Sequence, residues 1–248
     1  MHIEQRQDGI KMATDSNVTI GLLAGMGVRS TSPFVDLLIE ECQRQYGAKY
    51  ESDYPRMIIF SWPTPFFPDR QIDHDAMRDS ILEGLRWLDR TGVDFIAIPC
   101  NTAHIYFDDL AAAAQVPLLN MVDEAVASIP AEVGTIALLA TRATRDSGIY
   151  QDALAPRDFT VVASDDVQDE IDGLLKELRA VSDLTEQRSR WRALLSGLAD
   201  AGVGAGLVAC TDLNVLQDGA PPLQLMDGTR VLASRVIEKW RSMSVVAA

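Results

Sequence analysis

Cysteine and positive charge are both scarce in this sequence of 248 residues. Its three cysteines, Cys42, Cys100 and Cys210, are too few and too widely spaced for a disulfide framework, and none lies in a Cys-x-x-Cys or Cys/His pattern typical of zinc. Lys and Arg number 22 against 36 Asp and Glu, which gives a formal charge of −14 at pH 7. This charge repels phosphate backbones and anionic lipids, so the sequence argues against nucleic acid and membrane as partners.

Long hydrophobic runs are also missing. No apolar stretch approaches the roughly 20 residues that span a bilayer, because Lys, Arg, Asp or Pro interrupts each one. Residues 1–17 are polar and lack the apolar stretch of a secretory signal, so we expect a flexible N-terminal extension and a cytoplasmic protein. The composition, 47% hydrophobic and 23% charged, is that of a globular chain whose length suits one large α/β unit or two small ones.

The sequence does contain a regular alternation of short β-branched runs and longer amphipathic segments. This alternation predicts the α/β class, with mostly parallel sheets covered by helices. The expected strands are 18–24, 57–61, 93–99, 117–120, 135–140, 160–163, 206–209 and 223–226. The expected helices, whose apolar positions recur every three or four residues, are 33–46, 74–90, 103–114, 167–180, 184–201 and 229–243.

Two segments of the chain resemble each other. Residues 92–102 and 202–211 both read as Gly-Val, a buried strand, a cysteine and then a threonine. This correspondence favours two similar α/β halves with one cysteine each. The alternative is coincidence, since every α/β protein repeats its turns from strand to helix.

Cys100 and Cys210 each follow a strand directly, at the edge of the sheet where α/β proteins bind ligands. A thiol at the N-terminus of a helix meets the positive end of the helix dipole and unpaired N–H groups, which favour the thiolate. We therefore expect each of these thiols to act as a base. For either cysteine alone a buried structural role is the more common one. Cys42, inside the first helical segment, is expected to pack.

The two cysteines together point to a symmetric reaction. Racemisation needs one thiolate to remove a proton from Cα and an opposite thiol to return one to the other face. Asn101, Thr102 and Thr211, which follow the cysteines, offer hydrogen-bond donors suited to a carboxylate. His104, one helical turn after Cys100, is expected either to orient or acidify that thiol or to be an ordinary hydrogen-bonded histidine.

Several runs resemble the aspartate/glutamate racemase family in order and spacing. They are Gly25-Met26-Gly27, Pro99-Cys100-Asn101-Thr102-Ala103-His104, Leu139-Ala140-Thr141 with Ser147-Gly148-Ile149-Tyr150, and Ala209-Cys210-Thr211-Asp212. The resemblance covers about residues 18 to 240, and its most specific part is the run around Cys100. It implies two pseudo-symmetric Rossmann-like domains with the active site in the cleft between them. We expect the first domain to comprise residues 18–122 plus 225–248, and the second 123–224.

The resemblance also implies the residues of the site, with Cys100 and Cys210 as catalytic acid/bases. Pro68-Asp69-Arg70 is similar to a family loop whose arginine contacts the distal carboxylate of the substrate, and a solvated Arg70 is the alternative. Arg179 stands where many members have lysine, and Asp212 replaces the usual glutamate beside the second cysteine, so both are assigned supporting roles, as is His104. The residues assigned to substrate binding are Met26, Arg70, Asn101, Thr102, Thr141 and Thr211.

The sequence thus predicts a cofactor-independent racemase of an acidic amino acid, aspartate or glutamate. Two departures from the family pattern leave other side chains open: the bulky aromatic loop 62–67, and Arg29, which either adds charge near the cleft or faces solvent. The alternatives are a racemase of another amino acid, a maleate isomerase or hydantoin racemase of the same superfamily, and a catalytically silent carboxylate-binding relative. Neither metal nor organic cofactor is expected. The expected partner is a small-molecule substrate, and a homodimer stays open.

Overall fold

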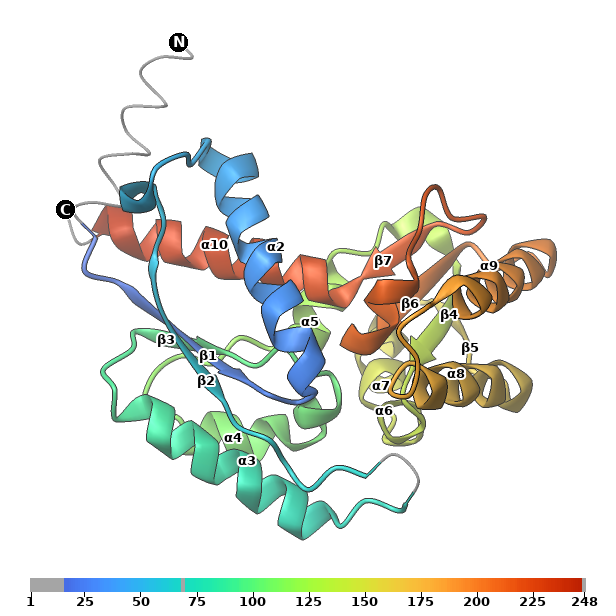
Figure 1. Ribbon diagram of the computed structural model, residues 1–248, viewed down its shortest axis with the longest axis horizontal. Coiled ribbons are helices and arrows are strands. Elements are labelled where there is room, and N and C mark those ends of the chain that lie inside the picture. Colours follow the sequence, from blue (N-terminus) through green and yellow to red (C-terminus); the bar gives the residue numbers. More distant parts are fainter. Residues whose placement is uncertain (1–15, 68–69, 247–248) are drawn as a thin grey trace.

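The structure, a computed structural model, describes residues 16–67 and 70–246, which form two α/β halves side by side (Figure 1). In the first half, three parallel strands lie in the order β2-β1-β3. In the second half, four parallel strands lie in the order β5-β4-β6-β7. The strands are β1 Thr19–Ala24, β2 Arg56–Ser61, β3 Phe95–Ala97, β4 Thr135–Ala140, β5 Thr160–Val162, β6 Ala205–Ala209 and β7 Leu225–Asp227.

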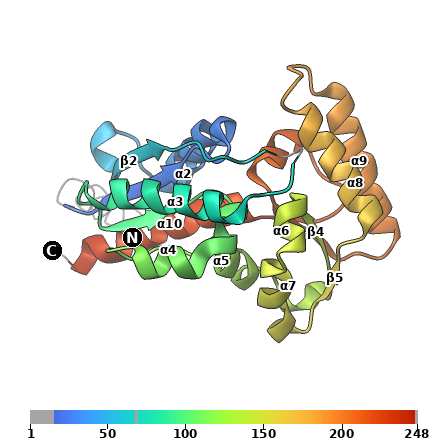
Figure 2. The same ribbon diagram turned by 90° about the horizontal axis from the view of Figure 1, so that it is seen from below.

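The helices cover both faces of each sheet (Figures 1 and 2). The last helix, α10, begins beside β7 in the second half and runs back to pack against α2 in the first. The helices are α2 Thr31–Tyr46, α3 His74–Asp89, α4 Phe107–Ala113, α5 Met121–Ala127, α6 Arg142–Asp146, α7 Ile149–Leu154, α8 Asp165–Glu177, α9 Thr185–Asp200 and α10 Gly228–Val246.

The two sheets repeat one arrangement. In each, the strand that comes first in sequence lies between the second and the third, so β1 corresponds to β4, β2 to β5 and β3 to β6. The predicted fold class, two pseudo-symmetric α/β domains with parallel sheets, is therefore confirmed. Because β3 and β6 are equivalent, the cysteines that follow them occupy equivalent edges of their sheets.

Successive side chains along a strand point to opposite faces of the sheet and so join different buried clusters. In β1, Ile20 and Leu22 pack in one fully buried cluster with Trp240 of α10. Leu23, one position on, points to the other face and packs with Ile81 of α3. Each such side chain contributes about 1.5–3 kcal/mol when it leaves water. The near-continuous apolar run of β1 is thus explained by helices on both sides of the sheet.

The structure corrects two of the predicted elements. The strand expected at 117–120 is wrong, because the segment forms only a single bridge between Leu118 and Ile96 before Asn120 caps α5. The helix expected at 103–114 begins as the 3-10 turn Thr102–Tyr106, and α4 follows it. The other predicted strands and helices are present with ends shifted by a few residues. The sequence does not predict the short helices α5, α6 and α7, because they are too brief to show a hydrophobic period.

The expected domain boundaries also differ from those that the observed packing indicates. Residues 1–15 of the expected extension lie outside the described residues, but Ser16 is 5% exposed and its hydroxyl lies 2.7 Å from that of Ser244. The expected return to the first domain at 225 falls on β7, which pairs with β6 of the second sheet. The return therefore takes place within α10.

Candidate active site

A chamber of about 390 Å³ lies between the two halves, at the carboxyl ends of their strands. We call it the thiol chamber because Cys100, after β3, and Cys210, after β6, both line it. The other predicted site residues in its lining are Met26, Asn101, Thr102, Thr141, Arg179, Thr211 and Asp212. The structure thus brings together nine of the predicted residues and leaves Arg70 and His104 outside the lining.

His104 holds the main chain behind Cys100. Its Nδ1 lies 2.8 Å from the carbonyl oxygen of Cys100, and the N–H of Met121 donates to its Nε2 at 3.0 Å. Because the carbonyl only accepts and the N–H only donates, we assign the proton of the neutral ring to Nδ1. Burial lowers the pKa of the ring, which is 4% exposed. Its orienting role therefore acts through the main chain, and a neutral ring bonded in this way does not acidify the thiol.

The two thiols are harder to ionise than a free cysteine. Burial raises the pKa of Cys100 to about 11 and that of Cys210 to about 12, and the negative charge of Asp212 adds to both increases. The backbone N–H groups lower both pKa values as expected, but the expected net preference for the thiolates is wrong. Each cysteine precedes a 3-10 turn, Thr102–Tyr106 or Thr211–Leu216, and burial outweighs the backbone N–H groups that those turns direct at sulfur.

Polar side chains meet where the two halves join. The hydroxyl of Tyr150 donates to Oδ1 of Asn101 at 2.5 Å, and Nδ2 of the same side chain is buried with no acceptor among the described residues. The hydroxyls of Thr102, Thr141 and Thr144 lie within 3.2 Å of one another and link the halves in a closed triangle. A buried amide donor without a partner suits an oxygen of a bound molecule.

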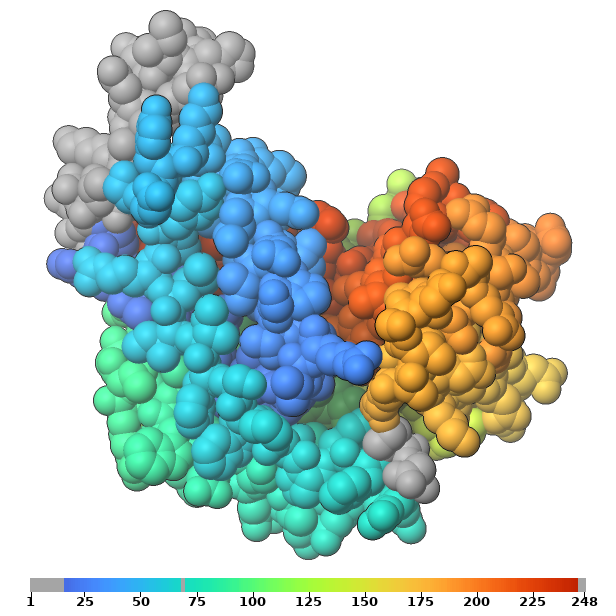
Figure 3. Space-filling model, in the orientation of Figure 1, coloured from blue at the N-terminus to red at the C-terminus, as the bar shows by residue number. Residues whose placement is uncertain are grey.

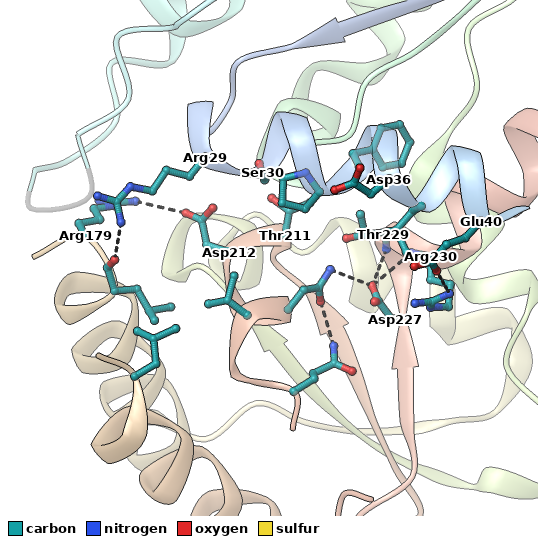
Figure 4. Close-up of a pocket in the computed structure, with 18 of the residues that line it drawn as sticks. Arg29, Ser30, Asp36, Glu40, Arg179, Thr211, Asp212, Asp227, Thr229 and Arg230 are labelled. Atoms are coloured by element: carbon teal, nitrogen blue, oxygen red, sulfur yellow. Dashed lines mark hydrogen bonds and ion pairs between the residues drawn. The ribbon is translucent and has the colours of Figure 1, made fainter. Parts of the chain in front are cut away.

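Three charged side chains, Arg29, Arg179 and Asp212, line one side of the chamber, and Figure 4 shows how these three lie relative to one another. Arg29, in the 3-10 turn Val28–Ser30, donates through Nη1 to the carbonyl oxygen of Leu178 at 3.0 Å. Nη2 of Arg179 lies 4.0 Å from Oδ2 of Asp212. Burial raises the pKa of Asp212, and the two arginines oppose that rise. Two guanidinium groups against one carboxylate leave local positive charge, which favours an anionic group in the chamber.

Arg70 and the aromatic residues before it lie at different places relative to the thiol chamber. Arg70 is exposed, and its guanidinium carbon lies 5.1 Å from the ring centre of Phe67. The expected residues 68–69 of the same motif lie outside the described part of the chain. Phe66 lines the chamber, whereas Trp62 packs against α3 with its indole N–H donating to a main-chain carbonyl at 2.9 Å. The loop thus adds one ring to the chamber wall and uses another for packing.

Tyr150 and Thr144 are site residues that the sequence-based prediction does not include. Both are fully buried and bond to Asn101 or Thr102 from the opposite half of the molecule. Tyr150 belongs to the run of residues 147–150 that resembles the family. That resemblance marks Tyr150 in the sequence but does not identify Asn101 as its partner. Thr144 has a weaker signal in the sequence, which is its position three residues after Thr141. In the structure the hydroxyl of Thr141 accepts a hydrogen bond from the N–H of Thr144.

The donors in the chamber are thiols, hydroxyls, an amide and charged side chains. Within residues 16–67 and 70–246, no three His, Cys, Asp or Glu side chains are grouped so that they hold a metal ion. Within the same residues, no helix has the length and apolar character to cross a membrane.

Comparison with known proteins gives a consistent result. The Asp/Glu/Hydantoin racemase family model matches residues 23–236. The broad specificity amino-acid racemase RacX of Bacillus subtilis (strain 168) is 39% identical over 225 residues, which cover 89% of this chain and 97% of that protein. Picrophilus torridus aspartate racemase superposes with a TM-score of 0.77 at 25% identity, covering 90% of this chain and 94% of that one.

A more distant structure shows the same two-domain fold. Glutamate racemase from Francisella tularensis, solved in complex with D-glutamate, superposes with a TM-score of 0.65 at 17% identity, covering 90% of this chain and 80% of that one. The family model spans most of the chain, and the relative in Bacillus subtilis matches along nearly its whole length. The chain therefore belongs to the Asp/Glu/hydantoin racemase family and is an amino-acid racemase, an isomerase of the aspartate/glutamate type.

Proposed function

We propose that this racemase interconverts the enantiomers of an acidic amino acid, aspartate or glutamate, by proton transfer between Cys100 and Cys210 without metal or organic cofactor. One observation carries the proposal: the two cysteines follow equivalent strands of the two domains and line one chamber. A planar carbanion is reached from both faces only by groups on opposite sides of it. Cysteines contributed by two facing domains meet that requirement.

The proposed reaction moves one proton off Cα and another onto it. The thiolate of one cysteine takes the Cα proton, and the electron pair of the C–H bond passes to Cα and into the α-carboxylate. The thiol of the other cysteine gives its proton to the opposite face, so Cα is inverted and the negative charge ends on the second sulfur. The charge of Cys100 itself raises the pKa of Cys210, which favours the form with one thiolate and one thiol.

The polar lining supports a place for the α-carboxylate and the amine. We assign these groups to Nδ2 of Asn101 and to the hydroxyls of Thr102, Thr141 and Thr211, since Nδ2 lacks a partner among the described residues and all four residues line the chamber. Met26, which is 7% exposed, is assigned to the apolar wall. A substrate held at both α-groups presents its Cα between the two cysteines.

The distal carboxylate is the reason for proposing an acidic substrate. The local positive charge left by Arg29 and Arg179 beside Asp212 offsets the overall negative charge of the protein at this place. Arg70 stays proposed as a second contact of the same carboxylate. It follows Phe66 of the chamber wall by four positions, within the reach of a short loop segment.

Arg70→Ala tests that second contact. We expect the kcat/KM for aspartate and glutamate to fall by about tenfold or more, because a guanidinium–carboxylate contact is lost. Apolar amino acids should be affected far less. Initial rates with both kinds of substrate measure the difference. A change under about threefold for the acidic substrates, within the range of an exposed surface charge, refutes the anchoring role.

A wider substrate range is the second candidate function. The thiol chamber has an apolar wall that includes Phe66, Pro63 and Met77, and such a wall accepts uncharged side chains. The relative in Bacillus subtilis is described as a broad specificity amino-acid racemase. Both observations favour activity on amino acids other than aspartate and glutamate.

Proton NMR in heavy water, with no cofactor added, tests the function and separates the candidates. Across a panel of L- and D-amino acids we expect loss of the Cα–H signal and formation of the opposite enantiomer. Exchange confined to aspartate or glutamate supports the first candidate, and exchange across the panel supports the second. Binding of amino acids without any Cα–H exchange would show a catalytically silent binding protein and refute both.

The raised thiol pKa values predict how the rate depends on pH. Since a thiolate must form first, kcat/KM should rise with pH between about 7 and 9, by up to about tenfold per pH unit. The charge of Asp212 raises the pKa of both thiols, so Asp212→Asn should move the rising limb to lower pH by about half a unit or more. The substrate titrates in the same way with the wild-type and Asp212→Asn proteins. The shift between their two pH profiles therefore reports a change in the pKa of a group on the enzyme. A limb that stays in place or moves to higher pH contradicts this role of Asp212.

A further inference from the structure

A second hollow, of about 610 Å³, adjoins the thiol chamber. We call it the outer chamber. It lies between α2, the segment after α8 and the start of α10, and Figure 3 shows the surface hollowed between α2 and the second half, above the point where the halves touch. The residues that line both chambers, and so form the wall between them, are Arg29, Arg179, Thr211 and Asp212.

Arg29 is the first domain's part of that wall. Arg179, Thr211 and Asp212 all belong to the second domain, and the side chain of Arg29 extends toward them from the opposite side of the cleft (Figure 4). Its hydrogen bond ends on the carbonyl oxygen of Leu178, just after the last turn of α8, where the helix dipole is negative. The wall is therefore completed across the cleft by one exposed, long side chain.

The outer chamber has an apolar part to which both domains contribute, beside its polar and charged residues. Its charged side chains apart from the wall are Asp36, Glu40, Asp227 and Arg230. Glu40 and Arg230 pair at 3.1 Å, and Asp227 accepts a hydrogen bond from the N–H of Thr229 at 2.8 Å. An extended hydrocarbon side chain suits the apolar part of this lining. The apolar contributors from both domains are Phe34, Leu37, Leu178, Val181, Leu184 and Val215.

We propose that Arg29 determines which amino acids the racemase accepts: its guanidinium favours a distal carboxylate inside the thiol chamber, and its side chain bars longer side chains from the outer chamber. This inference rests on the proposed function, because both effects act on a substrate whose Cα lies between the two cysteines. The outer chamber is then a subsite for long aliphatic side chains that opens when Arg29 is absent or displaced.

Two variants separate the charge of Arg29 from its blocking role. Arg29→Ala removes both, so the kcat/KM of Cα–H exchange should fall about tenfold or more for glutamate and rise about tenfold or more for 2-aminooctanoate, whose side chain is longer and uncharged. Arg29→Gln removes the charge and keeps a long side chain with an N–H donor for the Leu178 carbonyl. We expect it to lose glutamate activity without gaining activity on 2-aminooctanoate.

Arg188→Ala is the matched control. Arg188 is another exposed arginine whose guanidinium donates to a main-chain carbonyl, that of Val215 at 3.3 Å, and it lines neither the thiol chamber nor the outer chamber. Arg188→Ala should leave the ratio of kcat/KM for glutamate to kcat/KM for 2-aminooctanoate unchanged. Equal loss of both substrates in Arg29→Ala, or no change in either, overturns the inference and leaves Arg29 a structural contact. Absence of exchange by the wild-type protein with every amino acid refutes the proposed function instead.

Discussion

Replacing either Cys100 or Cys210 by alanine should abolish net racemisation, with kcat/KM lower by about a thousandfold or more in both directions. Inversion needs a base on one face of Cα and an acid on the other, and each variant retains a thiol on one face only. The remaining thiol can still remove a proton and return it to the same face. Exchange of Cα–H for deuterium should therefore survive with one enantiomer, and the two variants should prefer opposite enantiomers.

Polarimetry measures the loss of racemisation, and NMR in heavy water measures exchange with each enantiomer separately. Cys42→Ala is the control: Cys42 is 1% exposed within α2, and burial raises its pKa to about 11, as it does for Cys100. It packs in the core of the first domain, so its loss should lower stability but not activity per folded molecule. Racemisation near the wild-type rate by Cys100→Ala or Cys210→Ala would refute the two-base mechanism.

The equivalence of the two cysteines was predictable because its signals are local. A buried strand, a cysteine and a threonine one or two residues later occur in this order twice, and in a parallel sheet the carboxyl ends of strands share one edge. The structure adds that β3 and β6 hold the same place in sheets of the same order. The alternation of strands and helices then largely fixes the rest of the fold, since connections between parallel strands have one preferred hand.

Contacts between the two domains were not predictable in the same way. The bond from Tyr150 to Asn101 and that from Arg29 to Leu178 join segments far apart in the sequence, and no periodicity encodes them. The raised pKa values of the two thiols also arise from packing between the domains, and so they were not predictable either. The helix-terminus argument considers only the residues next to the cysteine, whereas burial depends on both domains packing over it.

The second large effect is expected from Gly25→Ala. Gly25 has a φ of 92°, in the left-handed region that disfavours L side chains, and an added Cβ would lie 2.6 Å from the backbone nitrogen of Trp62. That nitrogen donates to the carbonyl of Ala24 at 2.9 Å, so the clash would separate the loops after β1 and β2, both of which line the thiol chamber. Backbone strain and the clash together should lower the free energy of unfolding by about 2–4 kcal/mol and also reduce activity.

Gly47→Ala separates the strain from the clash. Gly47 has a similar φ of 77° at the end of α2, but an added Cβ there has no atom within 4 Å. Only the strain applies, so the loss of stability should be about 1 kcal/mol and the activity should be unchanged. Urea unfolding and Cα–H exchange on both variants measure the difference. Equal destabilisation by the two substitutions would show that the contact between Gly25 and Trp62 is loose enough to yield, and that the loop positions around the thiols do not depend on it.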